Sequence, residues 1–323
     1  MFLNNSHKFS YHSFGRDVLY NVLEKIQIKK NDLILLPEII CDVLLPTFYK
    51  FSENIKYYKV DRKLNPLNIF ELDQAKVILL INYFGFPQDI VQLCSFCTEN
   101  GITLIEDNAH GLYSKDVNGN YLGTRADFGI FSYRKTFFLP DGALLYSKDF
   151  LFNSDKSNQF SKSVKIKFYI KLLIINFSKK INFNLLVYLR LVISKFRFWA
   201  SSNDSNFEYH FEKINKPTEY SFVFFQNVNE SFEYLRRRNL FIEFEKKLKA
   251  FNIEPVFDCL PDNVCPYGYP FYVDDVQELN KIIKLANKCG FECVYWPQLP
   301  KESNISFGDM ISGKIFFINF TFQ

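Results

Sequence analysis

Short apolar runs alternate with amphipathic segments along residues 16–111 of the chain. Four runs are strand-like: 32–37, 55–60, 76–85 (closed by Gly85) and 102–111. Three segments place their apolar side chains at helical spacing: 16–29, 40–51 (broken near Pro46) and 87–100. Because parallel strands are joined through crossover helices, this alternation predicts a doubly wound α/β sheet of mostly parallel strands. In such sheets, ligands bind beyond the carboxyl ends of the strands.

The last third of the chain returns to α/β character after a long basic stretch over about 151–215. Residues 219–228 (EYSFVFFQNV) are predicted to form a strand, and residues 230–251 a long helix. The run YPFYV, the helical segment DVQELNKIIKLANKCG and the run ECVYWP then predict a small βαβ unit. At 323 residues, we expect a large domain over 1–235 and a smaller C-terminal α/β domain over 236–323.

Composition excludes several classes of protein. With 48% hydrophobic residues the chain can bury a substantial core, which argues against disorder. The net charge of +4 is too small to indicate a nucleic-acid partner. Seven cysteines, and an N-terminal stretch (MFLNNSHKFSYHSF) without an apolar core, favour a reduced, cytoplasmic setting. We interpret the C-x-x-C of Cys94 and Cys97 as small apolar residues rather than a metal or redox site.

Two charged residues stand where strands give way to loops. Asp107 closes the mostly apolar run ITLIED, and Lys135 follows the run FGIF within SYRK. Taken alone, Asp107 is interpreted as a helix cap or ion-pair partner, and Lys135 as a solvated loop lysine. Taken together, they suit pyridoxal 5'-phosphate, which needs a carboxylate beside its ring nitrogen and an amine for a Schiff base. Ser132, with Gly15 and Arg16 at a helix start, offers a phosphate cradle.

These segments resemble the DegT-type (DegT/DnrJ/StrS) sugar aminotransferases, which are fold-type-I enzymes dependent on pyridoxal phosphate. The resemblance covers most of residues 12–149 and 217–300. It is carried by five stretches: FGRDVLYNVLEKIQIKKNDLILLPEIICDVLLPTF, INYFGFPQDI, LIEDNAHG, NGNYLGTRADFGIFSYRKTFFLPDGALLYSKD and YPFYVDDVQELNKIIKLANKCGFECVYWP. It implies a large domain with a mixed, mostly parallel sheet and a smaller C-terminal α/β domain.

The resemblance also implies roles for individual residues. Asp107 would pair with the pyridine nitrogen, and His110 would contact the cofactor ring or its phenolic oxygen. Ser132 would bind the phosphate and Lys135 would form the Schiff base. The helix that begins at Gly15 and Arg16 would hold the phosphate, and Cys41 stands where the family has an aromatic residue beside the cofactor.

The chain departs from the family pattern at several positions. Ser132 and Lys135 are three residues apart, whereas the family spacing is five. The Gly-Gly pair after the lysine is Gly142-Ala143, and Asn82 stands where histidine is frequent.

By resemblance, the chain would transaminate a nucleotide-linked keto sugar with an amino-acid donor such as glutamate, in surface-glycan or related amino-sugar synthesis. It would work as a homodimer. Two alternatives remain open: a sugar dehydratase, against which Lys135 argues because those enzymes tend to carry histidine there, and a catalytically altered or inactive scaffold, which the short spacing favours.

The basic stretch permits two interpretations. Residues 151–200 hold ten Lys or Arg and one acid, and no uncharged apolar run in the stretch approaches the roughly 18 residues of a membrane span. Helices over 164–198 would either pack on the protein body or a dimer partner, or lie on an anionic membrane surface. Elsewhere, Arg236, Arg237 and Arg238 are predicted to form the solvated face of a helix, and Trp199 and Trp296 to be packing residues.

Overall fold

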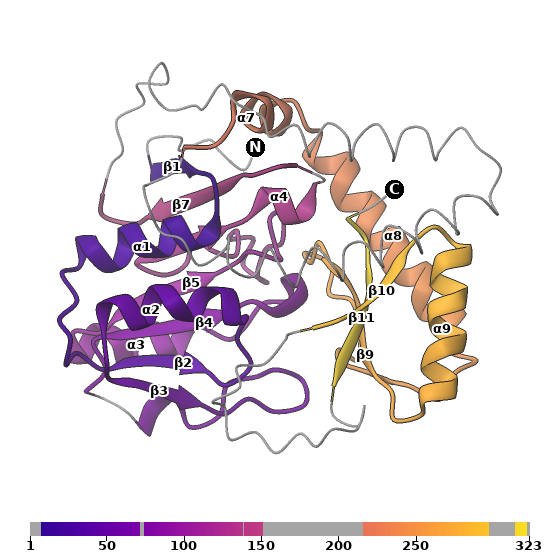
Figure 1. Ribbon diagram of the computed structural model, residues 1–323, viewed down its shortest axis with the longest axis horizontal. Coiled ribbons are helices and arrows are strands. Elements are labelled where there is room, and N and C mark those ends of the chain that lie inside the picture. The colour runs from indigo at the N-terminus through magenta and orange to yellow at the C-terminus, as the bar shows by residue number, and fades with distance from the viewer. Residues whose placement is uncertain (1–7, 72–73, 138, 151–215, 297–313, 322–323) are drawn as a thin grey trace.

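The computed structural model describes residues 8–71, 74–137, 139–150, 216–296 and 314–321, and contains two β-sheets (Figure 1). The larger sheet has seven strands: β1 (Phe9–His12), β2 (Ile34–Pro37), β3 (Ile55–Tyr58), β4 (Val77–Ile81), β5 (Thr103–Asp107), β6 (Phe128–Phe131) and β7 (Ala143–Ser147). Their spatial order is β1-β7-β6-β5-β4-β2-β3. Strands β2 to β6 pair in parallel, and only the pairs that include β7 are antiparallel. The predicted mixed, mostly parallel sheet is confirmed.

Helices cover both faces of this sheet because its strands are apolar on both sides. On one face, α1 (Gly15–Lys25) and α2 (Leu45–Phe51) pack in a cluster that includes Leu36 of β2 and Leu79 of β4. On the other face, α3 (Val91–Asn100) packs against Leu35 and Ile78, the neighbours of those residues along the same strands. The three predicted helices and four predicted strands of this region are all present.

Residues 219–228 do not form the predicted strand. They contain helix α7 (Glu219–Gln226), whose N-cap Thr218 accepts a hydrogen bond from the amide of Ser221. The helix buries only part of the aromatic run. The ring of Phe225 stacks on the ring of Tyr133 with centroids 4.4 Å apart, whereas Phe224 is exposed. Capping at the start of the segment therefore outweighed its aromatic composition.

The smaller sheet consists of β8 (Glu254–Pro255), β9 (Gly268–Tyr272), β10 (Glu292–Tyr295) and β11 (Ile315–Asn319), in the order β10-β11-β9-β8. Strand β11 is antiparallel to both neighbours, so β9 and β10 run in the same direction on either side of it. The predicted βαβ unit is thus present, split by a strand that was not predicted. Helix α8 (Glu230–Leu248) spans the predicted domain boundary at residues 235 and 236, and that division stays a prediction.

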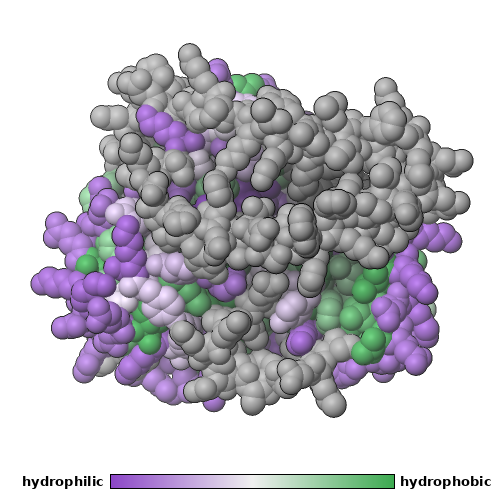
Figure 2. Space-filling view, viewed as in Figure 1, coloured by the Kyte–Doolittle hydropathy of each residue, from purple (hydrophilic) through white to green (hydrophobic). Residues whose placement is uncertain are grey.

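Helix α9 (Val276–Lys288) is the amphipathic cover of the smaller sheet. It buries Leu279, Ile282 and Ala286 and leaves its other side hydrophilic, as the right-hand edge of Figure 2 shows. None of the helices in the described parts of the chain combines the length and apolar character that crossing a bilayer requires. The basic stretch 151–215, with the predicted membrane contact at 164–198 and Trp199, lies outside the described residues.

The predicted solvated face at residues 236–238 is wrong. The side chain of Arg237 is 1% exposed and lies on the buried stripe of α8, four residues after its ion-pair partner Glu233. Arg236 and Arg238 also turn to backbone carbonyl groups, those of Phe320 and Val264 respectively. A run of arginines indicates solvation only where no carbonyl oxygens are within reach, and here the neighbouring loops supply them.

Gly142 joins the turn after α4 (Tyr133–Thr136) to the start of α1. Its amide donates to the carbonyl of Ser13 at 2.7 Å, and its carbonyl accepts from the amide of Arg134 at 3.1 Å. Its φ is +133°, and a Cβ atom placed there would lie 2.0 Å from the ring of Tyr133. No residue but glycine fits, so this position fixes how closely the two helix starts approach each other.

We predict that Gly142→Ala lowers the free energy of unfolding by about 3 kcal/mol or more, because backbone strain and overlap with Tyr133 add up. Gly119→Ala is the matched control: its φ is +82°, but no atom lies within 4 Å of the added Cβ. Gly119→Ala should lower the free energy of unfolding by only about 1–2 kcal/mol. Urea denaturation measures both, and equal losses would contradict the packing argument.

Candidate active site

The predicted site residues meet in one cavity of about 200 Å³ at the carboxyl edge of the large sheet. All seven line it: Gly15, Arg16, Cys41, Asp107, His110, Ser132 and Lys135. They come from the start of α1, the loop after β2, the end of β5 and the segment after β6, as expected for a ligand site of a parallel sheet. The remaining wall is formed by Phe14, Val43, Leu44, Ile81, Ala109, Ile130, Arg134 and Trp296.

Asp107 presents a buried carboxylate to this cavity. One oxygen accepts a hydrogen bond from the amide of Ala109 at 2.9 Å, and the other has no hydrogen-bond donor among the described residues. Burial raises the pKa of Asp107, while the positive charge of Lys135 and the Ala109 hydrogen bond act in the opposite direction. A buried carboxylate with a free oxygen can accept a hydrogen bond from a protonated nitrogen of a ligand.

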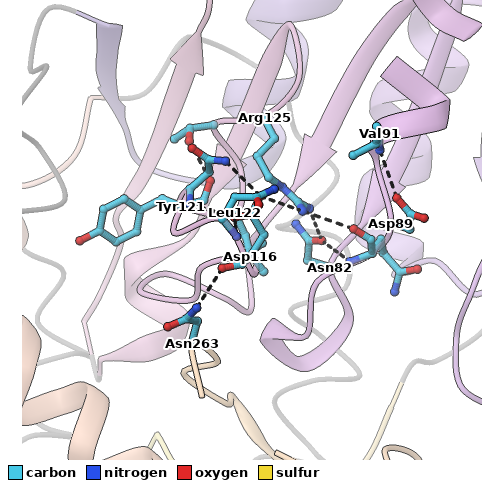
Figure 3. Close-up of polar contacts among 12 residues, drawn as sticks. Asn82, Asp89, Val91, Asp116, Tyr121, Leu122, Arg125 and Asn263 are labelled. Carbon is cyan, nitrogen blue, oxygen red and sulfur yellow. Dashed lines mark hydrogen bonds and ion pairs between the residues drawn. The ribbon is translucent and has the colours of Figure 1, made fainter. Parts of the chain in front are cut away.

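The neighbouring acid, Glu106, is held on the opposite face of β5 by Arg125. Their side chains are 0% and 7% exposed and lie 2.6 Å apart. Asn82 donates to Glu106 at 2.8 Å and accepts from Arg125 at 3.2 Å (Figure 3). Asn82 therefore sits at the predicted sheet edge, but its side chain belongs to this network and not to the cavity.

Lys135 lies beside His110, with 3.4 Å between Nζ and Nε2. Burial, and secondly the charge of Lys135, hold the pKa of His110 well below its usual value, so the imidazole is neutral at pH 7. Its Nδ1 is buried and has no hydrogen-bond partner among the described residues. The lysine thus faces a neutral ring whose Nε2 can accept a hydrogen bond from Nζ.

Aromatic rings fix the plane of His110. The ring of Tyr267 stacks on it with centroids 4.4 Å apart and an angle of 4°, and Trp296 meets it edge-on at 5.2 Å. Trp296 also contacts Phe84 at 5.3 Å, so it packs as predicted and lines the cavity as well. Sequence patterns did not reveal the roles of Tyr267 and Trp296, since both come from segments more than 150 residues after His110.

One corner of the cavity is suited to an anion. The guanidinium of Arg16 is buried over the ring of Phe14, and it makes no hydrogen bond or ion pair to any residue that the structure describes. The hydroxyl of Ser132 likewise makes no hydrogen bond within the described part of the chain. The amides of Gly15 and Arg16 belong to the first turn of α1, which lacks intrahelical acceptors. The charge of Arg16 acts on the neighbouring carboxylate of Asp17, but the two side chains form no ion pair. The donors of the guanidinium therefore remain available, so this corner fits a phosphate group.

Cys41, for which the resemblance implies a position beside the cofactor, contributes a thiol to the cavity wall. Burial raises the pKa of this thiol, and the charge of Lys135 partly opposes the shift. The Cys41 side chain is therefore a neutral, compact part of the wall near the lysine. The seven cysteines are free, and the described residues include no cluster of three or more His, Cys, Asp or Glu side chains that could hold a metal ion.

The model of the DegT/DnrJ/EryC1/StrS aminotransferase family matches residues 49–150, which include Asp107, His110, Ser132 and Lys135. The resemblance predicted from the sequence is confirmed. A dTDP-4-dehydro-2,3,6-trideoxy-D-glucose 4-aminotransferase of Saccharopolyspora spinosa is 28% identical over 143 residues. That match covers 42% of this chain and 37% of the relative, so the chain spans well under half the length of this curated relative.

Solved structures extend the likeness of the fold to nearly the whole chain. The aminotransferase TlmJ of Streptoalloteichus hindustanus has a TM-score of 0.64 at 16% identity, covering 98% of this chain and 82% of TlmJ. The PLP form of Spr1654 from Streptococcus pneumoniae has a TM-score of 0.61 at 15% identity, covering 96% and 81%. The predicted fold class is confirmed: two sheets in the arrangement of an aminotransferase.

We predict that Lys135→Met raises the pKa of His110 in the cofactor-free protein, because the neighbouring positive charge is removed. The pKa should stay below 6.5, since burial is the larger cause and persists. His12 is the internal control, because burial alone lowers its pKa to about 4. Histidine ring signals followed by NMR across a pH titration measure both, and an unchanged His110 would contradict the proximity of the two groups.

Proposed function

We propose that the protein is a pyridoxal-phosphate-dependent aminotransferase that transfers an amino group from an amino acid such as glutamate to a nucleotide-linked keto sugar. The observation that carries the proposal is the joint placement of three groups in one cavity: the Asp107 carboxylate, the Lys135 amine and the anion-binding corner around Arg16. Pyridoxal phosphate matches all three, with a protonatable nitrogen, an aldehyde and a phosphate. The family match and the sugar specificity named for the relative support the substrate class.

The chain's own residues divide the work. Arg16, Ser132 and the first amides of α1 would hold the phosphate. Asp107 would accept a hydrogen bond from the ring nitrogen and keep its proton in place. When bound, the cofactor supplies an electron sink for negative charge on the donor's α-carbon. Lys135 Nζ would hold the cofactor's aldehyde carbon until the amine of the donor takes its place there. The released Nζ would then move the proton at the donor's α-carbon as a general base.

The shortened Ser132–Lys135 spacing does not separate the two residues, because both line the cavity, Ser132 as the N-cap of the single turn α4 and Lys135 as its third residue. This placement favours the aminotransferase over an inactive scaffold, and a lysine at position 135 argues against a dehydratase. From the family resemblance we also propose a homodimer, a cytoplasmic location and a role in polysaccharide or other amino-sugar synthesis.

The covalent site gives the first test. The purified protein should absorb visible light after incubation with pyridoxal phosphate, and glutamate should bleach that band. Borohydride reduction and peptide mapping should place the pyridoxyl group on Lys135. Labelling of Lys148 instead, or of no lysine, would overturn the assignment.

Asp107→Asn tests the carboxylate. The amide can still accept from Ala109 N–H, so the fold should persist, but it cannot hold a proton on the ring nitrogen, and turnover should fall about 100-fold or more. Asp89→Asn is the matched control: this exposed carboxylate accepts in the same way from the amide two residues ahead, at 3.2 Å, and lies outside the cavity. Steady-state kinetics compare the two, and near-equal activities would contradict the proposed cofactor geometry.

A further inference from the structure

The backbone of Lys135 is held by groups from outside the large sheet. Because α4 is a single turn, its last carbonyl groups have no donor within the helix. The hydroxyl of Thr321, just after β11, donates to the Lys135 carbonyl at 2.7 Å. Arg237 of α8 donates through Nη2 to the Thr136 carbonyl at 2.6 Å. Two consecutive carbonyls of the lysine-bearing turn thus rest on the C-terminal part of the chain.

Arg237 also binds the backbone of the residue that stacks on His110. Its Nη1 donates to the carbonyls of Pro266 and Tyr267, at 3.3 and 3.1 Å, and the ring of Tyr267 is the one stacked on His110. Its Nε donates to Glu233 at 2.6 Å, which balances the buried charge. The guanidinium of Arg237 therefore holds the backbone of Tyr267, whose ring stacks on His110, and the backbone of Thr136, which follows Lys135.

The donor Thr321 is tied to the same helix. Arg236, paired with Glu233 on α8, donates to the carbonyl of Phe320 at 3.0 Å. Phe320 directly precedes Thr321, so α8 anchors the segment that carries Thr321. The second donor to α4, Arg237, belongs to α8 itself. Planar guanidinium groups with several fixed donors are suited to such backbone fixation.

We propose that Thr321 and Arg237 are positioning residues, which set where Lys135 Nζ lies in the cavity and so make the reaction depend on the smaller sheet. The inference rests on the proposed function for its catalytic consequence, but not for the lysine's location. A lysine side chain has four rotatable bonds, so its reach is defined only if its backbone is fixed. A displacement of about 1 Å in an active site can cost about 100-fold in rate.

The test uses Thr321→Val, which replaces the hydroxyl with a methyl group, and Thr321→Ser, which keeps the hydroxyl. In the cofactor-free protein, the pKa of His110 measured by NMR should rise in the valine variant as Lys135 moves away, and should stay at the wild-type value in the serine variant. In the loaded enzyme, Thr321→Val should lower kcat about 10- to 100-fold, change KM for the donor little, and shift the pH midpoint of the visible band.

Arg237→Lys should act in the same direction, because an ammonium group cannot serve Glu233 and three carbonyls at once. Arg238→Lys is its matched control: the neighbouring guanidinium donates to the carbonyls of Pro261 and Val264 and does not reach α4. The control should keep the wild-type pH midpoint and His110 pKa.

The outcomes separate the two proposals. Variants that melt at lower temperature but retain the wild-type His110 pKa, pH midpoint and kcat would show a purely structural role and overturn the inference. A shifted His110 pKa in a protein that never attaches the cofactor to Lys135 would uphold the positioning of the lysine and overturn the proposed function.

Discussion

The ion pair between Glu106 and Arg125 is the constraint on which the site depends. Side chains alternate along a strand, so fixing Glu106 on one face of β5 turns Asp107 to the other. Removing one partner of such a buried pair typically costs about 3–5 kcal/mol, which makes this orientation hard to reverse. Arg125 also lies 3.8 Å from Asp116, and so joins the end of β5 to the loop that follows it. The ion pair of Glu106 outside the cavity thus determines that the side chain of Asp107 points into it.

The charged groups of the cavity come from three different elements. Asp107 lies at the end of β5, Arg16 at the start of α1, and Lys135 on α4, the helical turn after β6. The Arg16 guanidinium makes no hydrogen bond or ion pair among the described residues, and one Asp107 oxygen accepts no hydrogen bond there, so both groups keep hydrogen-bonding capacity for a ligand. A ligand with an anion at one end and a protonated nitrogen at the other would complete both, which is why this unbalanced arrangement indicates a binding site and not a structural ion pair.

Sequence patterns were sufficient wherever local periodicity and tertiary packing agree. The apolar runs of β2, β4 and β5 and the helices between them were predicted because a parallel sheet buries its strands on both faces. Asp107 and Lys135 were found because polar groups at strand ends stand out against such runs. Sequence patterns gave the wrong structure at residues 219–228, where an aromatic run capped by Thr218 forms a helix. They also failed at Arg237, because its burial depends on carbonyl groups about thirty residues away in the sequence. Tyr267 and Trp296 gave no local signal, since their function arises only where the two sheets meet.

The short spacing of Ser132 and Lys135 and the C-terminal support of α4 explain each other. Residues three apart on a helix are neighbours on its surface, and Ser132, the N-cap of α4, lines the same cavity as Lys135. A single turn, however, cannot satisfy its own terminal carbonyls, and burying them unpaired would cost about 1–3 kcal/mol each. Thr321 and Arg237 supply the missing donors. A longer loop could satisfy its backbone locally and would leave the lysine independent of the smaller sheet. In this chain, the compact loop makes Lys135 part of the contact between the two sheets, so a change in that contact would reach its amine directly.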